Sequence, residues 1–431
     1  MKHTPVWFQY PAFNWNKKHA IIIGGGIAGA QIAWHLCQEN WKITLIEHHD
    51  TLASEASGNP AGVISPKMTA TKSLGEDFYT ESFFYTLSQL EKLIQQGHNI
   101  TMDNCGVLQL AHNSREEKRW HSLKKRDFSA EFIQLLDEDE TIKTAGINLH
   151  SEHSYKSCYF PKGGWIQPAS FADALVDHPN ISVITQTKAI KIKKINNLWQ
   201  VYNENNQLIC QSEVAIIANG KDLFSFEQSS FLAGLPVAGQ TTSVAASTFS
   251  GKLKTVIGHE GYLTPAIPFQ NLVNPETQRH IIGATFERDN SNPILTAESN
   301  QQNFNCLQQY LPDFANSLTD ISSAHSAVRM TTPDRFPYVG ALPDKDFYQK
   351  HYHDLHQGKR WKQYPAPEYQ SGLFVLGGLG SRGVITSGYC AKALCDLIEN
   401  NQESEQTLQV LQHTHPARFI IKRLKQNNYD N

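Results

Sequence analysis

The sequence is short of charge and lacks long apolar runs, and each shortage excludes a class of protein. Charged residues make up 18% of the 431 residues, and the formal net charge is −3. The surface as a whole is therefore not built to attract nucleic acid, although a local basic patch is compatible with this total. No segment reaches the roughly 18 consecutive apolar residues that a membrane-spanning helix requires, so we expect no membrane span.

Paired cysteine motifs and hydrolase motifs are also missing. The seven cysteines are scattered without a C-x-x-C pair, which excludes a zinc ribbon and a disulfide framework and fits a reducing compartment. The N-terminal segment carries Pro and Asn where a secretory signal needs an unbroken apolar run, so we expect a cytoplasmic protein. Neither G-x-S-x-G nor H-E-x-x-H occurs, and the histidines of residues 351–356 lie in a polar insert. We therefore expect no metal site.

The first sixty residues contain a nucleotide-binding pattern. A β-branched run at 20–23 is followed by the glycine-rich stretch 24–29, an apolar helical pattern, and a second strand at 42–46 that ends in Glu47. This order predicts a dinucleotide-binding βαβ unit. An acid at this spacing binds both hydroxyls of an adenosine ribose and repels a 2′-phosphate, so Glu47 is the expected ribose ligand.

Each glycine of this stretch has an expected role. Gly24 allows the tight turn, Gly26 lets a pyrophosphate approach the backbone, and Gly29 lets the helix pack on the strand. The N–H groups of Ile27 and Ala28, together with the helix dipole, favour a bound phosphate. The pattern does not distinguish FAD from NAD.

A second glycine loop follows a predicted strand near the other end of the chain. Its expected cofactor contacts are Gly380, Ser381, Arg382 and Gly383, and a helix is predicted over about 385–399. A polar segment follows this helix where a second nucleotide-binding unit would need a strand. We therefore predict that both loops hold one elongated cofactor, which favours FAD, whose reduced ring a helix N-terminus can stabilise. Arg382 can also be a surface cation.

A series of motifs in one order resembles the D-amino-acid oxidase/glycine oxidase superfamily of flavoproteins. Within it, the chain is similar to the FAD-dependent half of the bifunctional tRNA-modifying MnmC enzymes. The motifs are 56–59 with Gly62 and Pro66, 163–165 with Pro168, 215–220, 236–240, 261–265, 282–285, 328–337, 379–383 and 415–418. The first fifteen residues resemble only the linker before that half, so methyl transfer is not expected.

The resemblance implies further contacts for the cofactor and the substrate. It implies cofactor contacts at Ser57, Asn59, Gly62, Ala218 and Gly220. It also implies non-covalent FAD, because no cysteine lies between residues 306 and 390, the stretch that leads to the second loop.

For the substrate, the resemblance implies that Arg329 binds a carboxylate and that Tyr262 contacts the substrate. Pairing of Arg329 with a structural acid such as Asp334, and core packing of Tyr262, are the alternatives.

The reaction implied by the resemblance is oxidation of a glycine unit on a wobble uridine. Hydride transfer from the glycine carbon to FAD leaves an imine, which water splits into glyoxylate and a 5-aminomethyl uridine. An oxidase of free glycine, sarcosine or a D-amino acid is the first alternative. A flavin-bearing RNA-binding protein without turnover is the second.

The resemblance also implies the domain organisation and a fold of class α/β plus α+β. A Rossmann-like FAD-binding domain is expected from residues 16–75, 150–225 and 326–400, and a mixed-sheet substrate domain from residues 76–149 and 226–325. Residues 1–15 form a linker-like segment, and residues 401–431 form a basic tail. The active site is expected at the domain junction.

The tail is the expected contact for tRNA. It contains Arg418, Lys422 and Arg423, and with the basic insert at 359–362 it can form a phosphate-binding rim with an aromatic residue for stacking. A solvated helix without a partner is the alternative.

Overall fold

The computed structural model describes residues 4–150, 152–268, 278–318, 321–359, 361–401 and 404–427, and the chain divides into two compact units. Unit 1 comprises Met1–Ser54, Ala172–Pro236 and Arg329–Asn431, and unit 2 comprises Glu55–Phe171 and Val237–Val328. Each unit is discontinuous in sequence, as expected, but the boundaries differ. Residues 55–75 and 150–171 belong to unit 2 because β3 (Gly62–Ile64) and β4 (Met102–Asp103) both pair with β8 (Gly164–Ile166).

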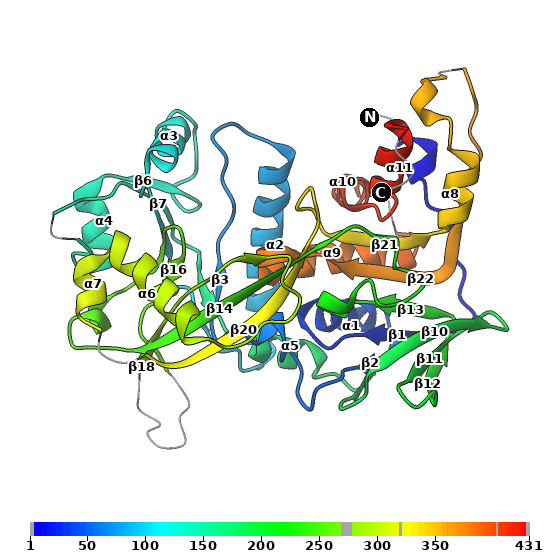
Figure 1. Cartoon of the computed structure of the whole chain (residues 1–431), viewed down its shortest axis with the longest axis horizontal. Helices are drawn as coiled ribbons and strands as arrows, with labels where there is room; N and C mark the ends of the chain where they lie inside the picture. The colour runs from blue at the N-terminus through cyan, green and yellow to red at the C-terminus, as the bar shows by residue number, and fades with distance from the viewer. Residues whose placement is uncertain are drawn as a thin grey trace. The chain divides into compact units, whose positions relative to one another are not determined.

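Unit 1 is built on a six-stranded sheet (Figure 1). Its order is β21 (Tyr338–Pro343), β22 (Tyr369–Gly377), β13 (Val214–Ile217), β1 (His19–Ile23), β2 (Lys42–Ile46) and β9 (Ile181–Ile184). All neighbouring strands are parallel except β21, which is antiparallel to β22. The central strands are apolar along almost their whole length, which is typical of a parallel sheet covered on both faces.

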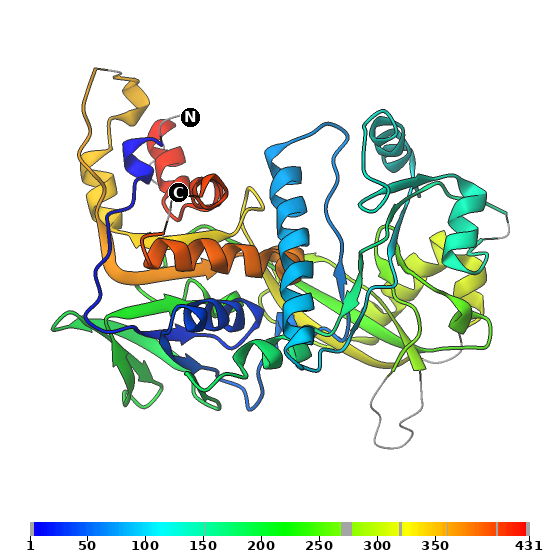
Figure 2. The ribbon, with the colours of Figure 1, turned by 180° about the vertical axis from the view of Figure 1, so that it is seen from behind.

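Helices and a second sheet complete unit 1 (Figure 2). The helices are α1 (Ile27–Gln38), α8 (Lys345–His351), α9 (Gly383–Ile398), α10 (Glu405–Thr414) and α11 (Arg418–Lys425). The second sheet is an antiparallel set of β10 (Ala189–Ile195), β11 (Leu198–Asn203) and β12 (Leu208–Ser212). Residues 4–15 and the described part of 401–431 also belong to unit 1 and pack within it.

Unit 2 contains a ten-stranded mixed sheet and the small β3–β8–β4 sheet. The order along the large sheet is β19 (Glu287–Arg288), β14 (Leu235–Ala245), β18 (Gln278–Gly283), β16 (Tyr262–Leu263), β15 (Val256–Gly258), β5 (Val107–Leu110), β7 (Ser157–Phe160) and β6 (Gln134–Leu136). The strand β17 (Ile267–Pro268) pairs with β18, and β20 (Ile321–Thr331) pairs with β14.

Among the described residues of unit 2, five helices flank these sheets. They are α2 (Leu74–Gln95), α3 (Ser114–Leu123), α4 (Glu138–Ala145), α6 (Ala297–Tyr310) and α7 (Pro312–Asn316), while α5 (Pro168–Val176) crosses the boundary between the units. Within the described ranges, none of the helices has the length and apolarity to cross a bilayer.

Candidate functional site

The candidate site lies where four parallel strands of unit 1 end. The strands β1, β2, β13 and β22 run in the same direction, so their carboxyl ends meet at one edge of the sheet. Ligands of open α/β sheets bind at this edge. The predicted cofactor residues Gly24, Glu47, Ala218 and Gly380 all follow these strands directly or within three residues.

The first glycine loop joins β1 to α1 in a geometry that excludes side chains. Gly24 has φ +109°, and a Cβ on it would lie 2.6 Å from the carbonyl oxygen of Ala218. A Cβ on Gly29 would lie 1.9 Å from the carbonyl oxygen of Gly24, so α1 packs directly against the loop. Gly26 caps α1 without a side-chain hydrogen bond, and the first turn has no acidic residue. The helix N-terminus, with Ile27 and Ala28 as its first residues, therefore has the polarity that suits a phosphate.

Glu47 is buried at the end of β2, with 5% of its surface exposed. Its Oε2 accepts a hydrogen bond from the Gly25 backbone N–H at 2.8 Å, and its Oε1 accepts one from the His49 backbone N–H at 2.9 Å. Glu47, His48 and His49 form the one cluster of potential metal ligands among the described residues. Because both carboxylate oxygens already bind backbone N–H groups next to the glycine loop, we assign no metal to this cluster.

An acceptor at the end of β13 was not selected from the sequence. Asn219 stands between Ala218 and Gly220, and its Nδ2 donates to the Asp222 carbonyl at 3.0 Å. Its Oδ1 is buried and has no partner among the described residues. A buried unpaired acceptor is costly, so a donor from a bound ligand would satisfy it. The signal in the sequence was a polar side chain two residues after a fully buried strand.

The second glycine loop adjoins the first. Gly380, Ser381 and Arg382 form a short 3₁₀ turn, and α9 begins at Gly383. A Cβ on Gly383 would lie 3.9 Å from Cγ2 of Ile27, the first residue of α1, so the two helices begin close together. No acidic residue stands in the first turn of α9 either. The predicted meeting of two distant glycine loops is therefore present within unit 1.

Arg329 lies on the last part of β20, whose final residue, Thr331, forms a bridge with Leu379 of the second loop. It is half-buried, and its neighbours Val328 and Met330 are buried. Residues two apart share a face of a strand, so Arg329 shares its face with Thr331. Thr331 forms a bridge with Leu379, and a Cβ on Gly380 would lie 3.3 Å from Oγ1 of Thr331. Arg329 therefore lies two residues before Thr331, the residue of β20 that contacts the second glycine loop.

The remaining predicted residues lie in unit 2. Ser57 lies in a 3₁₀ turn, and Gly62 begins β3. The Asn59 Nδ2 donates to the Tyr262 hydroxyl at 3.1 Å, and that hydroxyl donates to the Ala61 carbonyl at 3.1 Å. Tyr262 therefore holds the loop at 59–61 through hydrogen bonds, in addition to its partial burial in the core.

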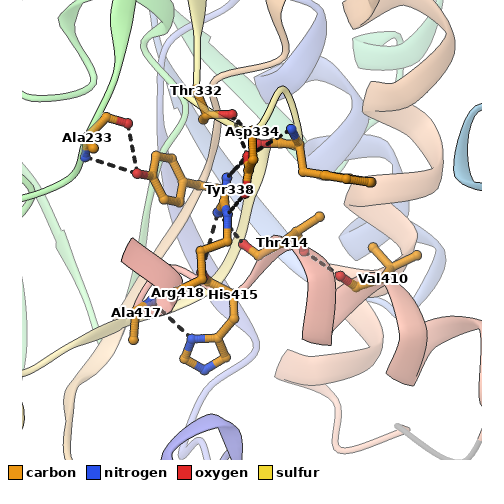
Figure 3. A network of polar contacts seen from close by, with 10 residues as sticks. Ala233, Thr332, Asp334, Tyr338, Val410, Thr414, His415, Ala417 and Arg418 are labelled. Carbon is orange, nitrogen blue, oxygen red and sulfur yellow. Dashed lines mark hydrogen bonds and ion pairs between the residues drawn. The ribbon is translucent and has the colours of Figure 1, made fainter. Parts of the chain in front are cut away.

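Arg418 holds the turn that follows Arg329 in sequence (Figure 3). Its Nε and Nη2 donate to the Asp334 carboxylate at 2.8 and 3.0 Å, and its Nη2 also donates to the Phe336 carbonyl at 2.6 Å. Its side chain is only 9% exposed and its guanidinium lies 4.3 Å from the centre of the Tyr338 ring. This placement differs from the tRNA contact expected for Arg418, because its guanidinium already forms an ion pair with Asp334 within unit 1. It also shows that Asp334 pairs with Arg418.

The arrangement in unit 1 fits FAD. Two helix N-termini without side-chain caps begin close together, the buried Glu47 follows β2, and Asn219 presents an unpaired acceptor. A family model described as "FAD dependent oxidoreductase" (DAO) matches residues 19–397. The chain belongs to this family. FAD is therefore its cofactor and oxidoreduction its class of reaction.

Several curated relatives extend the similarity over nearly the whole chain. The chain is 32% identical over 426 residues to "tRNA 5-methylaminomethyl-2-thiouridine biosynthesis bifunctional protein MnmC" of Pseudomonas syringae pv. tomato, which covers 97% of this chain and 61% of the relative. It is 30% identical to the protein of the same name from Chromobacterium violaceum, over 98% of this chain and 63% of the relative. The chain spans about three fifths of the length of these relatives, as the resemblance to one half predicted.

Solved structures share the fold. Glycine oxidase from Geobacillus kaustophilus matches with a TM-score of 0.69 and 19% identity, covering 88% of this chain and 94% of that chain. L-proline dehydrogenase from P. horikoshii matches with a TM-score of 0.68 and 14% identity, covering 94% of this chain and 99% of that chain. The expected fold class, a Rossmann-like FAD-binding part with a mixed-sheet part, is confirmed.

Replacing Glu47 by Gln is expected to weaken FAD binding. The amide has one oxygen where the carboxylate has two, so it leaves one of the two backbone N–H groups unpaired and binds ribose hydroxyls less strongly. Hydrogen bonds to charged groups contribute about 1.5–3 kcal/mol, so the Kd for FAD should rise about ten- to a hundredfold. Titration of the apoprotein with FAD measures this. Asp50→Asn, at an exposed carboxylate three residues away, is the matched control, and an equal effect in both variants would contradict the assignment.

The ion pair of Asp334 and Arg418 should make stability depend on pH. Burial opposes ionisation of Asp334, but the hydrogen bonds and charge of Arg418 outweigh it and hold the pKa of the carboxyl below its ordinary value of 3.8. The stabilisation is therefore present above the ordinary pKa and is lost as the pH falls through the lowered one. Because the Asp334 side chain is 38% exposed, Asp334→Asn should lower the free energy of unfolding at pH 7 by only about 1–2 kcal/mol.

Chemical denaturation of wild type and variant at pH 7 and at progressively lower pH measures this. The difference should shrink in acid, because the wild-type carboxyl becomes protonated. A difference that does not change with pH would contradict the assignment, and Asp127→Asn, at an exposed carboxylate, controls for loss of charge.

Proposed function

We propose that this chain is the FAD-dependent oxidoreductase of a tRNA wobble-uridine modification. It removes the carboxymethyl group of 5-carboxymethylaminomethyl-(2-thio)uridine as glyoxylate and leaves 5-aminomethyl-(2-thio)uridine. The observation that carries the proposal is the 32% identity over 97% of the chain to relatives named for tRNA 5-methylaminomethyl-2-thiouridine biosynthesis. The glycine oxidase that shares the fold is only 19% identical to this chain, so that likeness supports the fold and does not support free glycine as the substrate.

The substrate group is a glycine unit attached through its nitrogen to the uridine. Bound FAD supplies the acceptor for a hydride from the glycine carbon beside the amine. Loss of the hydride and of the amine proton leaves an imine, which has a carbon–nitrogen double bond. Water adds to the carbon of this imine, and the carbon–nitrogen bond then breaks to give glyoxylate and the primary amine of the nucleoside. The chain has to hold the carbon and the carboxylate in place, and the amine needs only to be neutral.

Arg329 is the proposed ligand of the substrate carboxylate. A planar guanidinium binds a carboxylate through two parallel hydrogen bonds and so fixes its orientation. The placement of Arg329 on the strand face it shares with Thr331, whose hydroxyl meets Gly380, supports this role. Asp334, the acid considered as a structural partner, is bound by Arg418.

The first glycine loop and Glu47 are proposed to bind the adenosine diphosphate part of FAD. Ala218, Asn219 and Gly220 would line the same edge, and Gly380 to Gly383 would contact the flavin. Ser57, Asn59 and Gly62 of unit 2 remain proposed cofactor contacts, with Tyr262 holding Asn59 in position. The proposal assigns no general base to the chain.

Product release from two substrates tests the proposal. Purified protein containing FAD is supplied either with tRNA that carries the 5-carboxymethylaminomethyl group or with free glycine, and glyoxylate is measured. We expect glyoxylate from the tRNA. Release from glycine but not from tRNA would instead indicate an oxidase of free amines, and release from neither, with FAD bound, would indicate an RNA-binding flavoprotein without turnover.

Arg329→Ala is expected to raise KM for the tRNA substrate and leave FAD bound. Loss of two hydrogen bonds to a carboxylate should lower kcat/KM about ten- to a hundredfold, and Arg329→Lys should restore only part of it because an ammonium cannot bind in the same planar geometry. Steady-state glyoxylate release, with the visible flavin absorbance of each variant, measures both effects. Arg115→Ala on the exposed start of α3 is the control. Loss of FAD from Arg329→Ala would show that Arg329 supports the cofactor.

A further inference from the structure

Three distant segments of unit 1 share one small core. We call residues 4–13, 344–364 and 415–427 the terminal lobe. Its core contains Tyr348, Tyr352, Leu355, Ile421 and Leu424 among the buried residues, with Trp7 and Tyr364 packed against them. The Tyr348 hydroxyl donates to the Trp7 carbonyl at 2.8 Å. Figures 1 and 2 show α8 and α11 side by side near both ends of the chain.

The terminal lobe carries a positive charge that the rest of the chain lacks. It contains nine Lys or Arg and three Asp, which gives a net charge of +6 in a chain whose total is −3. One of the nine, Arg360, lies outside the described residues. A second, Arg418, is neutralised by Asp334. The others lie on α8, on α11 and in the loop before Tyr364, which contact one another through the shared core.

Two aromatic rings connect the basic residues of α11 with those of the loop. The Lys425 ammonium lies 4.8 Å from the centre of the Trp7 ring, and the Trp7 and Tyr364 rings are 5.9 Å apart. The Lys362 ammonium lies 4.9 Å from the centre of the Tyr364 ring. Lys422 is exposed and lies one helical turn before Lys425, on the same face of α11. These three cations and two rings thus lie next to one another in a continuous row.

A buried acid fixes the geometry of the loop. Asp354 is only 3% exposed, and its Oδ2 accepts from Lys362 at 2.7 Å and from Lys359 at 3.4 Å. The hydrogen bond from Lys362 outweighs burial and holds the pKa of Asp354 below its ordinary value. The single negative charge offsets one of the two lysines, so the loop keeps a net positive charge in a defined position.

Trp361 projects from this loop next to Lys362. With 79% of its surface exposed, it is the most exposed of the large apolar side chains of the described residues. An indole held in water beside lysines is typical of sites that stack an unpaired base while cations bind the phosphates. The neighbouring Lys359 and Lys362, both bound to Asp354, distinguish this side chain from an isolated surface aromatic residue.

We propose that the terminal lobe binds RNA, with Trp361 stacking on an unpaired base and Lys422, Arg423 and Lys425 contacting the phosphates. That the bound RNA is tRNA rests on the proposed function. The terminal lobe is the surface that we infer to hold this tRNA. Arg418 is not part of this surface. Lys422 and Arg423, which were expected from the sequence to contact tRNA, are retained in it.

Binding of tRNA, measured separately from its oxidation, tests the proposal. Trp361→Ala should raise the Kd for tRNA about tenfold, and Trp361→Phe should keep most of the affinity because a ring remains for stacking. The double variant Lys422→Ala/Lys425→Ala should also raise the Kd about tenfold and reduce the slope of log K against log salt by about two. The matched control is Lys191→Ala/Lys193→Ala on β10, which removes two charges elsewhere in unit 1 and should change neither quantity.

Each outcome supports or overturns the inference. Unchanged tRNA affinity in the lobe variants, with an unchanged FAD content and thermal stability, would overturn it. An equal loss in the β10 control would also overturn it, because the effect would then be one of total charge. Binding of anionic phospholipid vesicles that depends on Trp361 as strongly as tRNA binding would indicate a membrane surface and overturn it too. Wild-type binding that depends on Trp361, without glyoxylate release, would support the lobe as an RNA site while contradicting the proposed function.

Discussion

The contact between α1 and the turn that precedes it determines how the site of unit 1 is built. Gly29 packs so closely that any Cβ would lie 1.9 Å from the carbonyl oxygen of Gly24. This contact points the N-terminus of α1 at the edge where β1, β2 and β13 end. Because α9 begins beside Ile27, the same contact also sets the position of the second glycine loop. A bulkier residue at 29 would therefore displace both helix N-termini from the edge at which the cofactor binds.

Local chemistry made much of this site predictable from the sequence. The strand expected at 42–46 is β2 with the same ends, and the strand expected at 20–23 is β1 with one additional residue. Apolar β-branched runs followed directly by glycines leave few alternatives to a strand, a tight turn and a helix. The second loop was identified by the same reasoning. The family, the cofactor and the fold inferred from these motifs are confirmed by the match over residues 19–397.

The parts that were not predicted depend on contacts between distant residues. The strand β3 pairs with β8, which lies about 100 residues later in sequence. This pairing places residues 55–75 and 150–171 in unit 2. Arg418 pairs with Asp334, 84 residues away, and a sequence pattern cannot show that a cation in a basic helix faces this carboxylate. The same holds for the terminal lobe, whose three segments come together only through the packing of Trp7, Tyr348, Tyr352 and Ile421. Asn219 was missed for a different reason, because its unpaired oxygen is visible only in the folded chain.

The chain combines a site for FAD with the proposed role of Arg329 as a carboxylate ligand and of the terminal lobe as an RNA-binding surface. We propose that the oxidised carbon is attached to a wobble uridine. The most direct measurement is to incubate the FAD-containing protein with tRNA carrying 5-carboxymethylaminomethyluridine, digest the tRNA, and identify the uridine by mass spectrometry. We expect conversion to 5-aminomethyluridine with one glyoxylate for each uridine. An unchanged nucleoside, from protein that holds FAD and oxidises free glycine, would contradict it.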